Sequence, residues 1–183
     1  MAFDELVMGA DVSGLWDTVA GGGGVEVAPF PNAVDRSLKL TSSPSGDPTT
    51  LCESVSAVDA MPLRVSADLL IAGGAEGASV RLELDDAAIG LVIRAGGVLG
   101  IEPVGRLVAG TVAAAQWYRV VLTLDPDRGT YRVTATPRNG DTIDGAEQSL
   151  SPMWRSSPSD PRLCISGPAV AGAELFLDNV AIE

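Results

Sequence analysis

Two alternating runs joined by a turn constrain the fold of this chain more than any other feature. In Trp117–Leu124 and in Tyr131–Thr136, one set of side chains alternates with another at every second position. Successive side chains of a β-strand point to opposite faces, so a period of two predicts strands. In the linking segment Asp125–Gly129, Pro126 presets φ at the first corner and Gly129 can adopt the left-handed conformation. The whole segment predicts a β-hairpin.

Strand-like runs recur at short spacing along the rest of the chain. They are Val25–Pro29, Ser37–Ser42, Thr50–Ser56, Leu63–Ala72, Ala78–Asp86, Gly90–Ala95, Val98–Pro103, Gly105–Val108, Arg162–Ser166 and Glu174–Ile182. Only Asp4–Met8 and Ala113–Gln116 are weak helix candidates, because no longer window has apolar residues at helical spacing. Gly73-Gly74 and Gly96-Gly97 are predicted hairpin tips. The pattern predicts an all-β, two-sheet sandwich or a barrel.

Composition narrows the class of protein. The 183 residues, 46% of them apolar, are enough for a single domain spanning 1–183 with a real core. No apolar run approaches the roughly 20 residues needed to cross a bilayer. The acidic first residues do not have the pattern of a signal peptide, so the sequence does not identify a cellular compartment. An extracellular or virion-surface location is expected if the chain is a mature or a phage protein. The net charge of −12 argues against nucleic-acid and membrane partners.

Two residue types bear on chemistry. The chain has no histidine, which removes the commonest general base and the commonest transition-metal ligand. Cys52 and Cys164 each lie in a strand-like run, and their spacing fits no zinc or redox motif. Without a visible signal peptide, two buried free thiols are the favoured interpretation. The alternative is a disulfide that closes a loop of over a hundred residues.

A series of short motifs resembles the concanavalin A-like, or laminin-G-like, jelly-roll superfamily. In order they are Phe3-Asp4-Glu5, Leu15-Trp16, Arg36–Leu40, Val65–Leu69, Gly90–Ile93, Trp117–Val120 and Leu177–Val180. The resemblance implies two antiparallel sheets packed face to face, one of them concave. The superfamily includes lectins, carbohydrate-binding modules, glycoside hydrolases, polysaccharide lyases, adhesion domains and virion surface proteins, so fold alone does not settle function.

Asp178 is the first candidate site residue. Strand alternation would place it in one row with Phe176, Val180 and Ile182, where a carboxylate needs a partner. That partner is either a set of backbone N–H groups, or Arg36, or a cation.

The superfamily resemblance implies that the cation is a structural calcium ion. Asp178 would bind it together with backbone carbonyls near Phe3 or Asp4 and near Asp35–Ser37. Calcium takes oxygen ligands and tolerates such a mixed shell.

Glu83 and Asp85 form a second candidate. Two apart on a strand, they would share one face roughly 6–7 Å from each other, a separation that suits a glycosidase acid and nucleophile. The resemblance implies an E-x-D-x-x-E motif in retaining hydrolases, but Ala88 stands where the third acid belongs. A solvated strand face that also carries Arg81 is the favoured interpretation.

Aromatic and polar side chains give further candidates for ligand binding. Only 4% of residues are aromatic. Trp16 and Trp117 are expected in the core, whereas Trp154, in a polar and Pro-rich loop, is the best sugar-stacking platform or else caps the sandwich edge. A polar row could bind hydroxyl groups if it lines the concave face, and it consists of Arg64, Ser66, Asp68, Arg81, Glu83 and Asp85.

These observations favour a non-catalytic, lectin-like recognition or surface module that binds a glycan or a protein surface. The alternative is a structural or assembly protein of a bacteriophage virion, a decoration, capsid-associated or tail component, with homo-oligomer or virion neighbours as partners. A glycan-active hydrolase or lyase is disfavoured, because histidine is absent and Lys39 is the only lysine.

Overall fold

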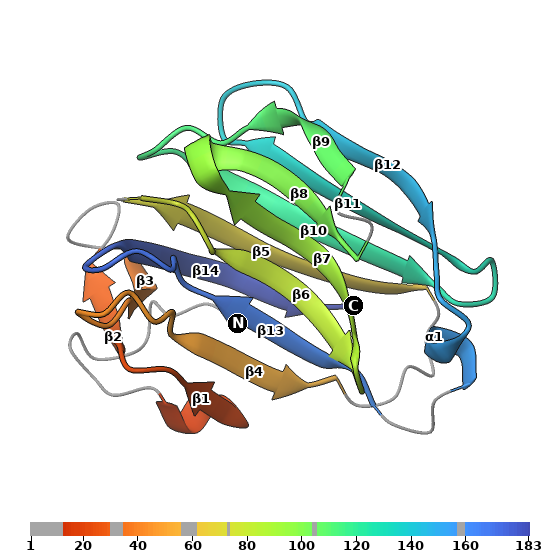
Figure 1. Cartoon of the computed structure of the whole chain (residues 1–183), viewed down its shortest axis with the longest axis horizontal. Helices are drawn as coiled ribbons and strands as arrows, with labels where there is room; N and C mark the ends of the chain where they lie inside the picture. The colour runs from red at the N-terminus through yellow and green to blue at the C-terminus, as the bar shows by residue number, and fades with distance from the viewer. Residues whose placement is uncertain (1–12, 30–34, 56–61, 73, 104–105, 157–159) are drawn as a thin grey trace.

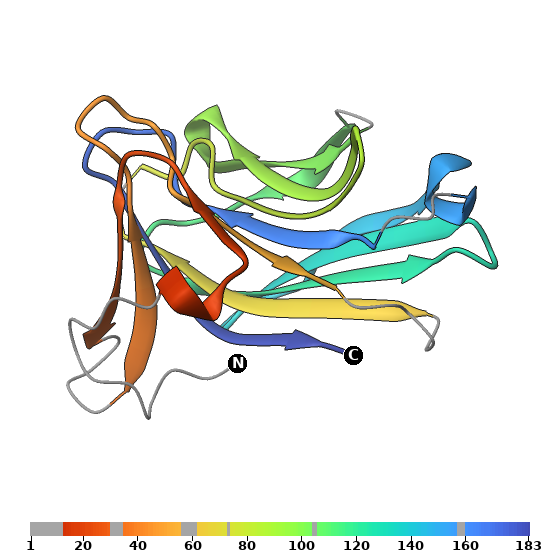
Figure 2. The same cartoon turned by 90° about the horizontal axis from the view of Figure 1, so that it is seen from below.

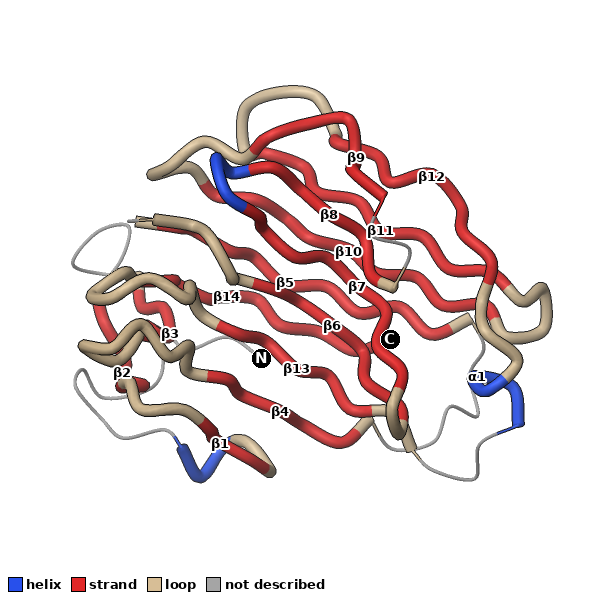
Figure 3. The backbone as a smooth tube through the Cα atoms, viewed as in Figure 1, coloured by secondary structure: helices blue, strands red, loops and turns tan. Residues whose placement is uncertain are grey.

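The computed structural model describes residues 13–29, 35–55, 62–72, 74–103, 106–156 and 160–183. Within these ranges, fourteen β-strands make up most of the backbone (Figures 1 and 3). The strands are β1 Thr18–Ala20, β2 Gly24–Pro29, β3 Arg36–Thr41, β4 Thr50–Ser54, β5 Leu63–Ile71, β6 Ser79–Leu84, β7 Ala87–Arg94, β8 Val98–Glu102, β9 Arg106–Thr111, β10 Trp117–Asp125, β11 Thr130–Pro137, β12 Ile143–Ser149, β13 Arg162–Ser166 and β14 Glu174–Ile182. The helical turns are η1 Ser13–Leu15, η2 Ala95–Gly97 and α1 Met153–Ser156.

The strands form two antiparallel sheets of seven strands each, which confirms the predicted sandwich. The β6 sheet has the order β1-β4-β13-β6-β7-β8-β9, and the β5 sheet has the order β12-β11-β10-β5-β14-β3-β2. Figure 2 shows the sheets as two layers, with the green strands of the β6 sheet curved so that its outer face is concave.

The hairpin and the closing strand are confirmed. β10 pairs with β11 from Tyr118↔Pro137 to Asp125↔Thr130, and the intervening Gly129 has φ 68°. β13 and β14 have the predicted bounds. The short edge strands β1 and β12 were not predicted. β12 consists mostly of polar residues and contains Gly145, so it lacks the apolar alternation that indicates a strand.

The helix predictions were less successful. Ala113–Gln116 forms a turn, with Ala115 at φ 58°, and Asp4–Met8 lies outside the described residues. The four-residue helix α1 was not predicted. No helix in the described ranges is long and apolar enough to cross a membrane.

One of the two predicted hairpin tips is wrong. The strands on either side of Gly96-Gly97 do pair, because β7 and β8 run antiparallel through Arg94↔Val98. Gly73-Gly74 instead lies between β5 and β6, which belong to different sheets. Two alternating runs separated by glycines therefore mark a crossover between layers here, which local sequence does not distinguish from a hairpin.

The core lies between the two sheets and consists of the apolar half of each alternating run. Leu38 and Leu177 from the β5 sheet and Leu51 and Leu82 from the β6 sheet are fully buried in it. Each such side chain stabilises the fold by about 2 kcal/mol relative to an exposed one. Tyr131 joins the layers, because its hydroxyl donates a hydrogen bond of 3.0 Å to the backbone carbonyl of Glu102 on β8.

The expectation of two free thiols is wrong, because Cys52 and Cys164 form a disulfide. They are register partners in the β4–β13 pair, with their Cα atoms 4.2 Å apart. The register of two strands that are distant in sequence decides this contact, so neither cysteine's local sequence could have indicated it.

Removing the disulfide is expected to destabilise the fold strongly. It spans 112 residues of sequence, and chain entropy predicts a loss of about 4–5 kcal/mol when such a loop is opened. Urea unfolding of the Cys52→Ala/Cys164→Ala variant should show this loss, and adding reductant should then change nothing further. Equal unfolding midpoints for the variant and the wild type would contradict the expectation.

Tyr131 is expected to make stability sensitive to alkaline pH. Burial raises the pKa of the Tyr131 phenol from 10.0 to about 12. Folding therefore favours the neutral phenol, and its contribution to stability is complete below about pH 10 and is lost as the pH rises toward about 12. The melting temperature of Tyr131→Phe should be lower at neutral pH, since a hydrogen bond worth about 1 kcal/mol is lost. It should fall less steeply than that of the wild type across the alkaline window, and parallel curves would refute the assignment.

Candidate functional site

A polar row crosses four neighbouring strands on the outer face of the β5 sheet. Register pairs Thr136 with Arg119, Arg119 with Asp68, and Asp68 with Asp178. The residues adjacent to them in sequence point to the opposite face of the sheet, into the core, as Val120 does next to Arg119. The sheet therefore brings side chains from β11, β10, β5 and β14 together on one outward-facing line.

An apolar row lies beside the polar one. Trp117, Leu70 and Phe176 are register partners two positions further along the same strands, a spacing of about 7 Å. With Ala28 they form a small apolar cluster separate from the core. Trp117 was expected in the core, and this expectation is wrong, because Trp117 is half-buried on the outer face. Its alternation partner Tyr118 is the one that faces inward.

A β-bulge at Asn179 shapes the end of the polar row. The β14–β5 register shifts between Asp178 and Ala181, and Asn179 has φ 49°. Asparagine tolerates this left-handed conformation better than most residues do. The extra residue turns Val180 into the core. The predicted row of Asp178 with Val180 and Ile182 is therefore wrong, because strand alternation does not continue through a bulge.

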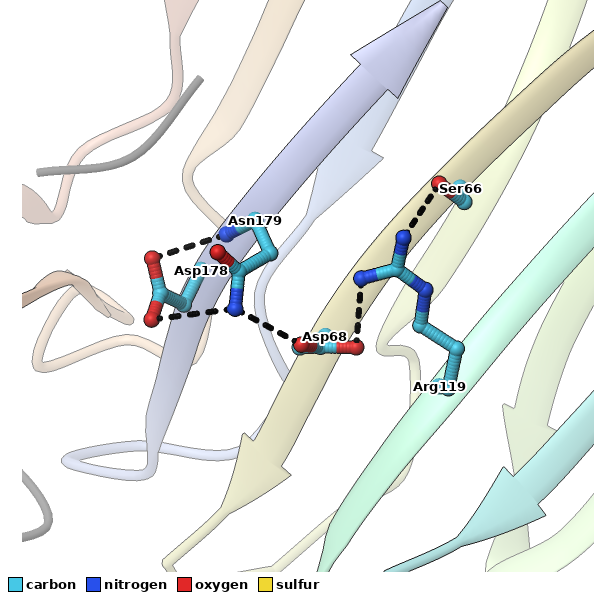
Figure 4. A network of polar contacts seen from close by, with 5 residues as sticks. All are labelled: Ser66, Asp68, Arg119, Asp178 and Asn179. Atoms are coloured by element: carbon cyan, nitrogen blue, oxygen red, sulfur yellow. Dashed lines mark hydrogen bonds and ion pairs between the residues drawn. The ribbon is translucent and has the colours of Figure 1, made fainter.

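Hydrogen bonds hold the polar side chains in one connected network (Figure 4). Arg119 donates from Nη1 to Asp68 Oδ1 at 3.1 Å and from Nη2 to Ser66 Oγ at 2.9 Å. Asn179 donates from Nδ2 to Asp68 Oδ2 at 2.9 Å, and its backbone N–H donates to Asp178 Oδ1 at 2.7 Å. Each carboxylate thus has an oriented position, with Asp68 held from both sides.

A pocket of about 540 Å³ opens over these rows. It is lined by Asp35, Asp68, Trp117, Tyr118, Arg119, Thr136, Pro137, Arg138, Asp178 and Asn179. We call it the Trp117 pocket. It combines one large aromatic side chain with carboxylate, guanidinium and amide groups, so it can contact both an apolar surface and several polar groups of one ligand.

The charges of the pocket are unevenly distributed. Asp68 and Asp178 are direct cross-strand partners, an arrangement that is unfavourable for like charges. Arg119 offsets this through its ion pair with Asp68 at 3.1 Å. The two side chains are 40% and 25% exposed, so water screens the pair and its contribution to stability is at most about 1 kcal/mol. The network orients groups more than it stabilises the fold.

Arg81 and Glu83 lie on the other sheet, on its concave outer face. Arg81 forms ion pairs with Glu83 at 3.3 Å and with Glu102 at 3.6 Å. Between Arg81 and Glu102 in the register is Gly90, at which an added Cβ would meet the carbonyl oxygen of Val80 at 2.2 Å. Glycine is therefore required at the centre of this face.

Asp85 does not share a strand with Glu83. β6 ends at Leu84, and Asp85 lies in the turn to β7, exposed and with φ 50°. The alternation that was expected to place both carboxylates on one face therefore does not extend to Asp85. Leu84 pairs with Ala87, so the turn between them consists of Asp85 and Asp86. Aspartate is a residue type that favours turns.

Trp154, the predicted stacking platform, is buried. Only 7% of it is exposed, and it packs into the main core from α1. The alternative interpretation, a residue that caps the sandwich edge, fits this position better. A polar, proline-rich stretch did not reveal that its single tryptophan points inward.

The predicted polar row is divided between the two sheets. Ser66 and Asp68 lie on β5, whereas Arg81 and Glu83 lie on β6, in the opposite layer. Of the side chains predicted from sequence as site residues, Asp68 and Asp178 meet in the Trp117 pocket, which Asp35 also lines.

Sequence reasoning missed several lining residues, among them Trp117, Arg119 and Asn179. For two of them a signal existed. Trp117 and Arg119 share the parity opposite to Tyr118 and Val120 in the hairpin strand, so one of the two sets had to face outward. For Asn179 no local signal existed, because the bulge is visible only in the pairing with β5.

Among the described residues Asp178 belongs to no cluster of three carboxylate or cysteine side chains, and the predicted shell of Asp178 with backbone carbonyls stays a prediction. Asp35 and Asp68 line the same pocket, but the ligand atoms of these three carboxylates are not gathered within 4.8 Å of one another. The group that does meet this criterion in the described ranges is Cys52, Glu83 and Cys164, whose sulfurs are in the disulfide. The carbonyls expected near Phe3 and Asp4 lie outside the described residues.

Comparisons by sequence and by structure give different results. No protein-family model and no curated protein sequence matches the chain. Several solved structures do match the chain. Lectin II from Ulex europaeus matches at a TM-score of 0.64 and 11% identity, covering 97% of each chain. The catalytic domain of a glycoside hydrolase family 131 protein from Coprinopsis cinerea matches at 0.66 and 13%, covering 100% of this chain and 92% of that one.

A sialidase matches at a TM-score of 0.63 and 15% identity over 90% of this chain, which spans only 16% of the sialidase. Identities this low establish the fold and not the activity. The chain has the concanavalin A-like jelly-roll fold that the sequence resemblance implied.

Proposed function

We propose that this chain is a non-catalytic recognition module that binds a sugar in the Trp117 pocket. The observation that carries the proposal is the position of Trp117 directly beside the connected network of Asp68, Arg119 and Asn179. Ligand sites typically combine apolar walls with a few well-placed polar groups, and the pocket volume of about 540 Å³ lies within their usual range.

The chemistry of a sugar ring matches these two rows. A pyranose has an apolar C–H face, which packs on aromatic rings, and a rim of hydroxyl groups, which bond to planar polar side chains. Trp117 would supply the first contact, and Asp68, Asp178 and Asn179 would supply the second. Because the network orients these groups before binding, little side-chain entropy is lost when the ligand arrives.

Two structural neighbours support sugar binding as a class. One is a lectin, UEA-II, in complex with galactose, and another is the winged bean acidic lectin in complex with methyl-α-D-galactose. Sugar binding by these two lectins supports a glycan as the ligand class, and the pocket supports its position on this chain. The Cys52–Cys164 disulfide supports an oxidising compartment such as the extracellular space, where such ligands occur.

A glycan array followed by calorimetric titration of the best ligand would test the proposal. Asp68→Asn is expected to weaken binding about tenfold or more, since it removes a hydrogen bond to a charged group worth about 1.5–3 kcal/mol. Trp117→Leu should weaken binding as well, because it removes the aromatic face on which the sugar would pack. The matched control is Glu83→Gln, which alters a carboxylate on the opposite sheet and should leave the affinity unchanged. Melting temperatures show whether each variant is folded. The absence of any array hit, or an effect of Glu83→Gln alone, would contradict this site.

The calcium prediction for Asp178 has a separate test. A structural ion would raise the melting temperature of the wild type in millimolar calcium relative to EDTA, because a ligand of the folded state stabilises it. Asp178→Asn would abolish the rise. An unchanged melting temperature in the wild type would rule out the calcium site. The virion-assembly alternative also stays a prediction, which light scattering on the purified chain would examine.

A further inference from the structure

We infer that Asn139-Gly140 is a chemical modification site, at which the side-chain amide of Asn139 is converted to a carboxylate by spontaneous deamidation. The pair lies in the loop 138–142, which joins β11 to β12. This chemistry belongs to the loop itself and is independent of sugar binding. It is indicated by the exposure of the pair, by the missing side chain at position 140 and by a contrast with Asn179.

The reaction joins an asparagine side chain to the backbone nitrogen that follows it. The Gly140 nitrogen attacks Cγ of Asn139, so a C–N bond forms there. The bond from Cγ to Nδ2 breaks, and ammonia leaves with the proton of the Gly140 N–H. The resulting succinimide ring then adds one water molecule. Opening at one carbonyl gives an aspartate, and opening at the other gives an isoaspartate, in which the main chain runs through the former side chain.

The loop leaves the reacting groups accessible. Asn139 and Gly140 are exposed, and neither the Asn139 side chain nor the Gly140 N–H forms a hydrogen bond with another described residue. The carbonyl oxygen of Asn139 accepts a bond of 3.3 Å from Nε2 of Gln116, which does not engage the reacting atoms. Gly140 has no Cβ to hinder the approach of its nitrogen, and glycine adopts many backbone conformations. The ring can therefore close without breaking a hydrogen bond of these two groups.

Asn179 is also exposed, but it is held in place. Its Nδ2 donates to Asp68 at 2.9 Å, and its backbone N–H donates to Asp178 at 2.7 Å. The residue that follows is Val180, which is β-branched and packs into the core. Ring closure at Asn179 would have to break the bond to Asp68 and displace Val180. The structure therefore favours Asn139 over Asn179, while the third asparagine, Asn32, lies outside the described residues.

Deamidation would place a new charge beside the Trp117 pocket. Arg138, the residue before Asn139, lines that pocket. The product carboxylate adds one negative charge to a chain whose net charge is already −12. In the isoaspartate product the main chain is one atom longer, and the carbonyl oxygen that Gln116 contacts becomes part of a free carboxylate. The modification thus changes both the charge and the backbone of the loop.

Peptide mass spectrometry of the folded chain, incubated at mildly alkaline pH, tests the inference. Cleavage after arginine puts Asn139 and Asn179 on separate peptides. The Asn139 peptide should gain one mass unit about tenfold or more faster than the Asn179 peptide, because breaking a hydrogen bond to a charged group slows the second reaction by about this factor. An isoaspartate-specific methyltransferase should label the converted peptide. The control variant Asn139→Gln should not show the gain, since glutamine would have to close a larger ring.

The same incubation in urea separates the effect of the fold from that of the local sequence. The rate at Asn139 should stay within about threefold of its value in the folded chain, a difference near thermal energy, because the loop already leaves the pair accessible. Conversion of Asn139 in urea but not in the folded chain would show that the loop protects the pair, and this would overturn the inference. Equal rates at Asn139 and Asn179 in the folded chain would overturn it as well.

Discussion

The register that joins β10, β5 and β14 is the constraint on which the site depends. Strand alternation divides each strand into a core-facing half and an outward half, and burial of the core-facing half makes a one-residue slip prohibitive. Once that register is set, Arg119, Asp68 and Asp178 must lie side by side on the outer face. The same register places Trp117 next to Leu70 and Phe176. The pocket is thus a consequence of core packing on the far side of the same strands.

Local departures from regular strands give the outer faces their chemistry. At Asn179 the bulge adds one residue to β14, which directs an amide toward Asp68 and returns Val180 to the core. On the other sheet, Gly90 keeps the centre of the concave face clear between Arg81 and Glu102. Both positions depend on backbone conformations that most side chains disfavour, with φ 49° and φ 154° respectively.

The two outer faces differ in what they offer a ligand. The concave face carries the ion pairs of Arg81 and the shielded Cys52–Cys164 disulfide, with no aromatic partner among the described side chains there. The opposite face carries Trp117 and a pocket. Curvature alone would have favoured the first face, while the combination of an aromatic side chain with oriented polar groups favours the second. This is why the proposal places recognition on the β5 sheet.

The sequence by itself determined the fold class, the hairpin from Trp117 to Pro137 and the closing strand, because period-two alternation and turn residues act over a few neighbouring positions. It also singled out Asp68 and Asp178. It did not determine that Cys52 meets Cys164, that Trp154 is buried while Trp117 faces outward, or that Arg64 and Arg81 belong to opposite layers. Each of these was decided only by the tertiary structure, since each depends on which distant strands pair, in what register and in which sheet. Local sequence carries the period of a strand but not the identity of its neighbours.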